Sequence, residues 1–219
     1  MICAYDKVYL DKARVVLARM MDFAVYDLHY KLKDFFDMFL ASGIAARFER
    51  GDFTLLVGKS GVEVAYEVLE NSGVSVERVK PKYTLERSEE YWTGWALAYY
   101  QWETGLRFEE IQRFAPIHYV QALYSPYHEM DIRHFVEKMN EMYRRANPDT
   151  NLKKKRQMVG LSQKELAEMA GIPLRTIQQY EQRQKNINHA KVEYLVQLSN
   201  TLCCEVECLI ERVGAYENK

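Results

Sequence analysis

The sequence is short of glycine, proline and cysteine, and it lacks any long apolar run. Ten glycines and five prolines among 219 residues are too few for an all-β chain with many tight turns. No apolar run approaches the ~20 residues that a membrane-spanning helix needs, and no basic segment leads into an apolar one at the start. Four cysteines, three of them close together near the end, do not form the disulfide framework of a secreted domain. We therefore expect a cytoplasmic protein with reduced thiols and no membrane segment.

Motifs for catalysis are also missing. The chain has no glycine-rich phosphate loop, no Gly-x-Ser-x-Gly segment and no His-Glu-x-x-His segment. Its five histidines are scattered, and its carboxylates form no pair suited to acid–base chemistry. The sequence therefore predicts a protein that is not an enzyme and that holds no cofactor.

The charge that is present is unevenly distributed. Residues 1–149 carry 19 Lys and Arg against 23 Asp and Glu, a net charge of −4, whereas residues 150–219 carry 11 against 8, a net charge of +3. Within residues 151–190 the count is 8 against 3, a net charge of +5. A basic stretch beside an acidic body is the pattern to test for nucleic-acid binding.

Hydrophobic periodicity predicts an all-α chain. Apolar residues recur at spacings of three and four from Leu10 to Leu28, which predicts a helix there. Further helices are expected over residues 34–41, 44–50, 61–73, 89–104, 108–113, 117–124 and 125–146. Residues 53–57 could form a short strand, and residues 73–87 a loop or at most two strands. Asn147-Pro148-Asp149-Thr150 is polar and turn-forming, so we expect a helical domain over residues 1–147 and a second domain over 150–213.

The second domain contains two short helices joined by a tight turn. Ser162-Gln163-Lys164-Glu165 is a capping box that predicts a helix from Gln163 to Ala170. Gly171 supplies the turn, and Pro173 precedes another helix from Leu174 to Glu181. Two short helices separated by a glycine-containing turn are typical of a helix-turn-helix.

Residues 151–210 resemble the Cro/C1-type (Xre) helix-turn-helix family. The matching positions are Leu152, Arg156, Leu161-Ser162-Gln163, Glu165-Leu166-Ala167, Gly171-Ile172, Thr176-Ile177, Tyr180-Glu181 and the apolar series Leu195, Leu198, Leu202, Val206 and Leu209. The resemblance implies a five-helix, lambda-repressor-like domain in which Arg156 and Glu181 form an ion pair. It also implies glycine at two positions where this chain has Arg183 and Cys203, which leaves the presentation of the second helix open.

The pattern of the second helix predicts how such a domain would meet DNA. Ile177 and Tyr180 are expected to face inward with Leu166, Ala167 and Ala170. The residues left to contact bases are Leu174, Arg175, Gln178 and Gln179. Contacts to phosphates are expected from Gln163, Lys153, Lys154, Lys155, Lys164, Arg183 and Lys185.

Three other clusters have an ordinary and a functional interpretation. His128, Asp131 and His134 have the spacing of a helical metal site, but a solvated helix face is favoured and we expect no metal. Cys204 and Cys208 occupy positions that are apolar in related domains, which favours core packing over zinc binding or redox sensing. The stripe Trp92, Trp95, Tyr99 and Trp102 favours core over a ligand groove.

Together these features predict a sequence-specific transcriptional regulator, in the form of a bacterial or phage repressor that binds double-stranded DNA as a homodimer. The first domain would supply dimerisation, ligand sensing or partner binding. The alternative is an antitoxin-like protein whose first domain binds a toxin while the second autoregulates the operon. A domain that has kept the fold but binds protein in place of DNA also remains open.

Overall fold

The computed structural model describes residues 3–75, 77–82 and 87–213, and within these ranges it contains helices and loops but no strand. The prediction of an all-α chain is confirmed. The chain divides into two compact units, Met1–Tyr143 and Arg144–Lys219. Among the described residues, no helix is both long and apolar enough to cross a bilayer.

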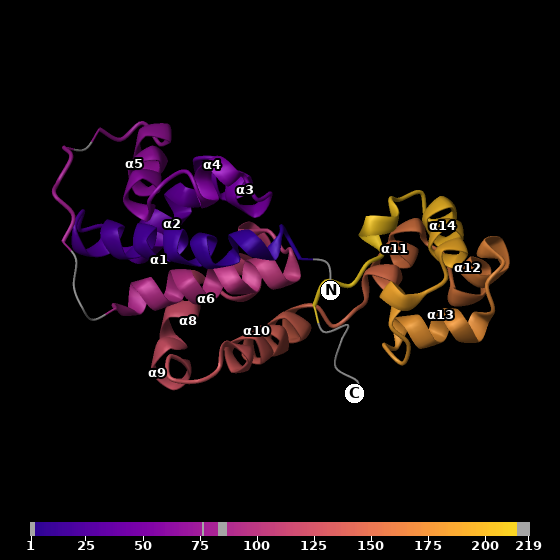
Figure 1. The fold of residues 1–219 in the computed structure, drawn as a ribbon. Coiled ribbons are helices and arrows are strands. Elements are labelled where there is room, and N and C mark those ends of the chain that lie inside the picture. Colours follow the sequence, from indigo (N-terminus) through magenta and orange to yellow (C-terminus); the bar gives the residue numbers. More distant parts are fainter. Residues whose placement is uncertain (1–2, 76, 83–86, 214–219) are drawn as a thin grey trace. The chain divides into compact units, whose positions relative to one another are not determined.

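The first unit is built around helix α1 (Leu10–Tyr26), which packs against α5 (Gly61–Asn71) and α6 (Glu89–Thr104) (Figure 1). Two glycines let the backbones approach closely. A Cβ atom added to Gly94 of α6 would lie 2.7 Å from the Leu17 carbonyl oxygen, and one added to Gly61 of α5 would lie 2.5 Å from the Val16 carbonyl oxygen. Around this centre lie α2 (Leu32–Ala41), α3 (Ile44–Glu49), α4 (Phe53–Leu56), α7 (Phe108–Phe114), α8 (Ile117–Ala122), α9 (Tyr124–Tyr127) and α10 (Ile132–Ala146).

The aromatic stripe of α6 belongs largely to this core. Trp92 and Trp102 are buried, and the Trp102 indole nitrogen donates to the Tyr5 carbonyl oxygen at 2.8 Å. Trp95 is half-buried beneath the Arg14 guanidinium, whose central carbon lies 3.3 Å from the ring centroid. The stripe therefore packs mainly as the core interpretation expects.

Two expectations for the first unit are wrong. Residues 53–57 form no strand, because the Asp52 carboxylate accepts a hydrogen bond from the Thr54 amide at 3.0 Å and so begins the short helix α4. The helix expected over residues 125–146 is divided into α9 and α10. The division occurs because the Asp131 carboxylate accepts from the Arg133 amide at 2.9 Å and so begins a new helix.

The same division separates the candidate metal ligands. Asp131 also binds the Arg133 side chain, and the His128 ring lies 3.0 Å from the Tyr124 carbonyl oxygen. Among the residues that the structure describes, no three His, Cys, Asp or Glu side chains gather as a metal site.

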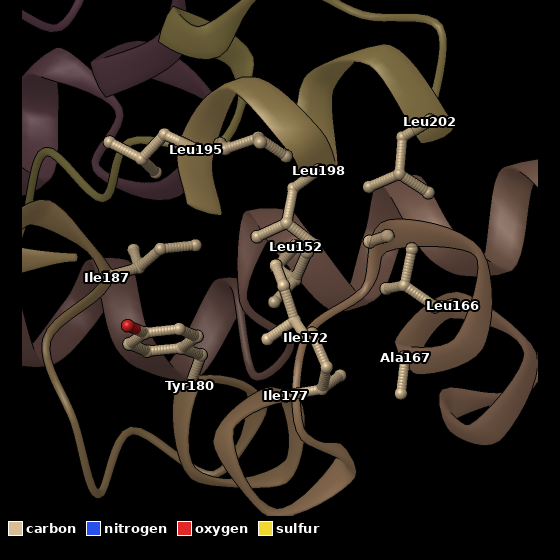
Figure 2. Packing of buried hydrophobic residues seen from close by; sticks show 12 residues of the cluster. Leu152, Leu166, Ala167, Ile172, Ile177, Tyr180, Ile187, Leu195, Leu198 and Leu202 are labelled. Atoms are coloured by element: carbon tan, nitrogen blue, oxygen red, sulfur yellow. The ribbon is translucent and has the colours of Figure 1, made fainter. Parts of the chain in front are cut away.

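The second unit contains α11 (Asn151–Val159), α12 (Gln163–Ala170), α13 (Leu174–Glu181) and α14 (Val192–Thr201). The fifth helix that the family resemblance implies is reduced to a single 3₁₀ turn, Val206–Cys208, and a second such turn occupies Ile187–His189. Figure 2 shows apolar side chains from all four α-helices in one cluster, including Leu152, Leu166, Ile177 and Leu198, together with Ile172 from the turn. This cluster fixes how the two short helices α12 and α13 meet.

The cysteines of this unit are free thiols with different environments. Cys204 is half-buried and packs against the core cluster, as expected. Cys208 is exposed, so the expectation that it packs in the core is wrong. The reason is that a 3₁₀ turn ends at Cys208, and the next residue, Leu209, takes the buried position.

Candidate nucleic-acid interface

Helix α12 begins at a complete capping box. The Glu165 amide donates to the Ser162 hydroxyl at 3.1 Å, and the Ser162 amide donates to the Glu165 carboxylate at 2.7 Å. Two of the amides that a helix start leaves without partners are thereby satisfied. The bonds that the Ser162 amide and hydroxyl donate to the Glu165 carboxylate hold the pKa of Glu165 below its ordinary value, because they favour the charged form.

The turn after α12 sets the direction of α13. Gly171 adopts a left-handed conformation with φ of 65°, and the Ile172 amide donates to the Ala167 carbonyl oxygen at 3.0 Å. Ile172 is buried, which anchors the turn in the core cluster. Pro173 then precedes the first residue of α13, where its fixed φ suits a helix start.

Helix α13 has a buried face and an outward face. Ile177 and Tyr180 are buried together with Leu166, Ala167 and Ala170 of α12, as the sequence predicts. The four predicted base-contact residues lie on the other side of α13. Leu174 is 38% exposed, Arg175 is exposed, and Gln178 and Gln179 are half-buried. The helix therefore presents one apolar side chain, one cation and two amides.

A buried ion pair ties the end of α13 to α11. Two guanidinium nitrogens of Arg156 donate to the two carboxylate oxygens of Glu181 at 2.7 and 2.8 Å, and the side chains are only 10% and 2% exposed. These bonds raise the pKa of Arg156 above its ordinary value. A third nitrogen of Arg156 donates to the Leu161 carbonyl oxygen at 2.7 Å. The position of α13 is thus fixed from the first helix of the domain.

The side chains predicted to contact phosphates are not equivalent in the structure. The side-chain nitrogen Nε2 of Gln163 donates to the Glu181 carboxylate at 2.8 Å, so this side chain belongs in part to the ion-pair network. Lys164 and Lys185 are exposed, and Lys164 lies 3.9 Å from Glu168. Lys155 is half-buried on α11. Lys164 and Lys185 are therefore accessible to a phosphate.

The remaining three cations bind the segment that precedes α11. Lys153 lies 2.6 Å from the Asp149 carboxylate, and Lys154 donates to the Asn147 side-chain oxygen at 3.0 Å. Arg183 donates to the carbonyl oxygens of Pro148 and Asn147 at 2.7 and 3.2 Å. In the structure the side chains of Lys153, Lys154 and Arg183 thus bind residues 147–149.

Arg183 and Cys203, which stand where the family resemblance implies glycine, both take a left-handed backbone conformation. Their φ angles are 56° and 50°. A residue with a Cβ atom in this region costs about 1 kcal/mol relative to glycine. The backbone beyond α13 and α14 therefore turns at these two residues although neither is glycine.

One structural feature of the domain was not predicted from the sequence. The Asn151 amide donates to the Glu211 carboxylate at 2.6 Å, and the Asn151 side chain donates to the Ile210 carbonyl oxygen at 2.7 Å. Asn188 exchanges two hydrogen bonds with the Glu211 backbone, at 2.6 and 2.9 Å. These four hydrogen bonds form a polar closure that joins the start of α11 to residues 210–211. Its sequence signal is the polar identity of Asn151, Asn188 and Glu211 within an otherwise apolar pattern.

Comparison with known protein families finds a match in this part of the chain. The helix-turn-helix family model HTH_3 matches residues 152–205, a range that spans α11 to α14. No curated protein and no solved structure matches the chain. A helix-turn-helix domain of this kind implies DNA binding. Residues 152–205, with their capped α12, glycine turn and ion-paired α13, are therefore a Cro/C1-type helix-turn-helix domain in the C-terminal part of this chain.

Proposed function

We propose that the protein is a sequence-specific transcriptional regulator that reads DNA through the outward face of α13. The observation that carries this proposal is the chemistry of that face. Leu174, Arg175, Gln178 and Gln179 lie on a helix whose opposite side is buried and whose end is fixed by the Arg156–Glu181 ion pair. A thin helix of this kind fits the major groove of B-form DNA.

Each outward side chain suits a particular base edge. The Arg175 guanidinium can donate two hydrogen bonds to the O6 and N7 atoms of guanine, and the Gln178 or Gln179 amide can pair with N6 and N7 of adenine. Leu174 can contact the methyl group of thymine. Lys164 and Lys185, both exposed, would add contacts to phosphates that fix the register without reading sequence.

We further propose that the protein acts as a dimeric repressor. A single α13 reads only a few base pairs, and two copies related by a two-fold axis would read half-sites about one DNA turn apart, roughly 34–36 Å. The first unit, which has its own aromatic core, would hold the two copies together or respond to a ligand or protein partner.

The test is a binding measurement on the full chain. Fluorescence anisotropy would compare the DNA upstream of the gene for this protein, or an operator selected from random sequence, with shuffled DNA at ~50 and ~200 mM salt. We expect at least a thousandfold preference for the selected sequence, the lower end of the range for specific regulators. Equal, weak binding to every sequence after selection would contradict sequence-specific recognition.

A further inference from the structure

The end of α13 is attached to the segment between α10 and α11, which lies within the second unit. Arg183 follows α13 by two residues, and its backbone amide donates to the Tyr180 carbonyl oxygen at 3.1 Å. Its side chain reaches residues 147 and 148, which immediately follow α10. The guanidinium therefore bonds to two consecutive backbone carbonyl groups 35 and 36 residues away in the chain.

The acceptors of these bonds suit a cation. The carbonyl groups of the last turn of a helix carry the negative end of its dipole. Asn147 and Pro148 directly follow the last turn of α10, so a cation is favoured beside them. A planar guanidinium can donate to both carbonyl groups at once, whereas the single ammonium group of a lysine lacks this fork geometry.

Two further bonds from α11 hold the same segment. Lys153 pairs with Asp149, and Lys154 with the Asn147 side chain. The Thr150 hydroxyl then accepts from the Lys153 amide at 3.2 Å and caps α11. Residues 147–150 are therefore fixed on one side to the first helix of the DNA-binding domain and on the other to the end of α13.

From this geometry we propose that Arg183 is a positioning residue and not the phosphate contact that the sequence predicts. It fastens the segment 147–149 to the end of α13 and so fixes the start of α11 relative to that helix.

The experiment uses the full chain and three variants. R183G removes the guanidinium and suits the left-handed backbone, and R183K keeps the charge but not the fork. K185A removes an exposed cation two residues away and serves as the matched control. Hydrogen exchange read by mass spectrometry would follow the amides of residues 143–146 and 151–154. We expect exchange there to accelerate about tenfold in R183G and R183K, and to stay unchanged in K185A.

The salt dependence of DNA binding gives the second readout, and this arm alone rests on the proposed function. Removing a phosphate contact lowers the slope of log K against log salt by about one. We expect the slope to fall by about one in K185A and to stay unchanged in R183G and R183K. A lower slope in R183G that R183K restores, with exchange as in the parent protein, would overturn the positioning role. If the parent protein binds no DNA, the proposed function fails, whereas the exchange result still decides the role of Arg183.

Discussion

At the scale of single residues, the strongest constraint on the DNA-binding domain is the Arg156–Glu181 ion pair. Both groups are buried, so removal of one partner leaves a charge without compensation, which typically costs about 3–5 kcal/mol. We expect Arg156→Ala to lower the free energy of unfolding of this domain by that amount, measured by urea denaturation.

The matched control is the double variant Arg156→Met with Glu181→Leu, which removes both charges and keeps apolar volume. We expect it to recover most of the lost stability, because no unpaired charge remains. An equal loss in the single and double variants would show that packing around Arg156, and not the uncompensated Glu181, limits stability.

Arg175 gives the residue-scale prediction for recognition. Arg175→Ala should weaken binding to the selected operator by about 1–3 kcal/mol and relax the preference at one base pair. Anisotropy titrations against single-base operator variants measure this, with Lys164→Ala as the control that weakens all sequences alike. If Arg175→Ala reduced the affinity for operator and random DNA equally, its proposed base contact would be contradicted.

The sequence predicted which side of α13 is buried better than it predicted the hydrogen-bond partners of the charged residues. The spacing of Ile177 and Tyr180 established which side of α13 is buried, because a helix has a fixed period. The partners of Lys153, Lys154 and Arg183 could not be predicted. A cation gives the same sequence signal whether it binds a phosphate or a carbonyl group elsewhere in the chain.

At the scale of elements, the contact between α1 and α6 depends on the absence of one side chain. An alanine in the middle of a helix normally stabilises it by about 0.5–1 kcal/mol relative to glycine. At Gly94 the added Cβ would meet the Leu17 carbonyl oxygen at 2.7 Å and the Ala18 Cα at 2.8 Å. We expect Gly94→Ala to destabilise the first unit by about 1–3 kcal/mol instead. Urea denaturation measures the free energy of unfolding of the variant relative to the parent protein. A variant more stable than the parent would contradict the close approach of α6 to α1.

The start of α4 makes the stability of the first unit depend on pH. Hydrogen bonds from Thr54 and Arg47 lower the pKa of Asp52 to about 2 from an ordinary value of 3.8. A lowered pKa in the folded state contributes stability above the ordinary pKa, and this contribution is lost as pH falls from about 4 to 2. The difference in melting temperature between the parent protein and Asp52→Asn should thus be present at pH 6 and shrink over that interval. A difference that is constant down to pH 2 would contradict this.

Prediction of elements succeeded where the capping signal was strong. Ser60, Ser88 and Ser162 each begin a helix at the expected residue, because a serine side chain satisfies a free amide there. Asp52 and Asp131 can act in the same way, but the short apolar run after Asp52 suggested a strand. Apolar periodicity alone does not separate a four-residue helix from a strand, and it does not reveal an internal cap in a helical pattern.

At the scale of the whole molecule, the two units should fold independently. Residues 144–219 have their own apolar cluster, and its polar closure extends to Glu211, beyond the residues that match the family model. We expect a fragment of residues 144–219 to be helical and to unfold cooperatively in circular dichroism. A fragment ending at residue 205 lacks Leu209 and Glu211 and should not. Cooperative unfolding of both would contradict this role of the closure.

The hydrogen bonds between Asn151 and residues 210–211 also place the entry and exit of the DNA-binding domain next to each other. A domain whose two ends meet can be inserted into a surface loop of a host protein with little distortion of the host. For the same reason it can be circularly permuted, with a short linker across the old ends and new termini in an exposed loop. The closure that completes the fold thus makes this domain suitable as an insertable DNA-binding module.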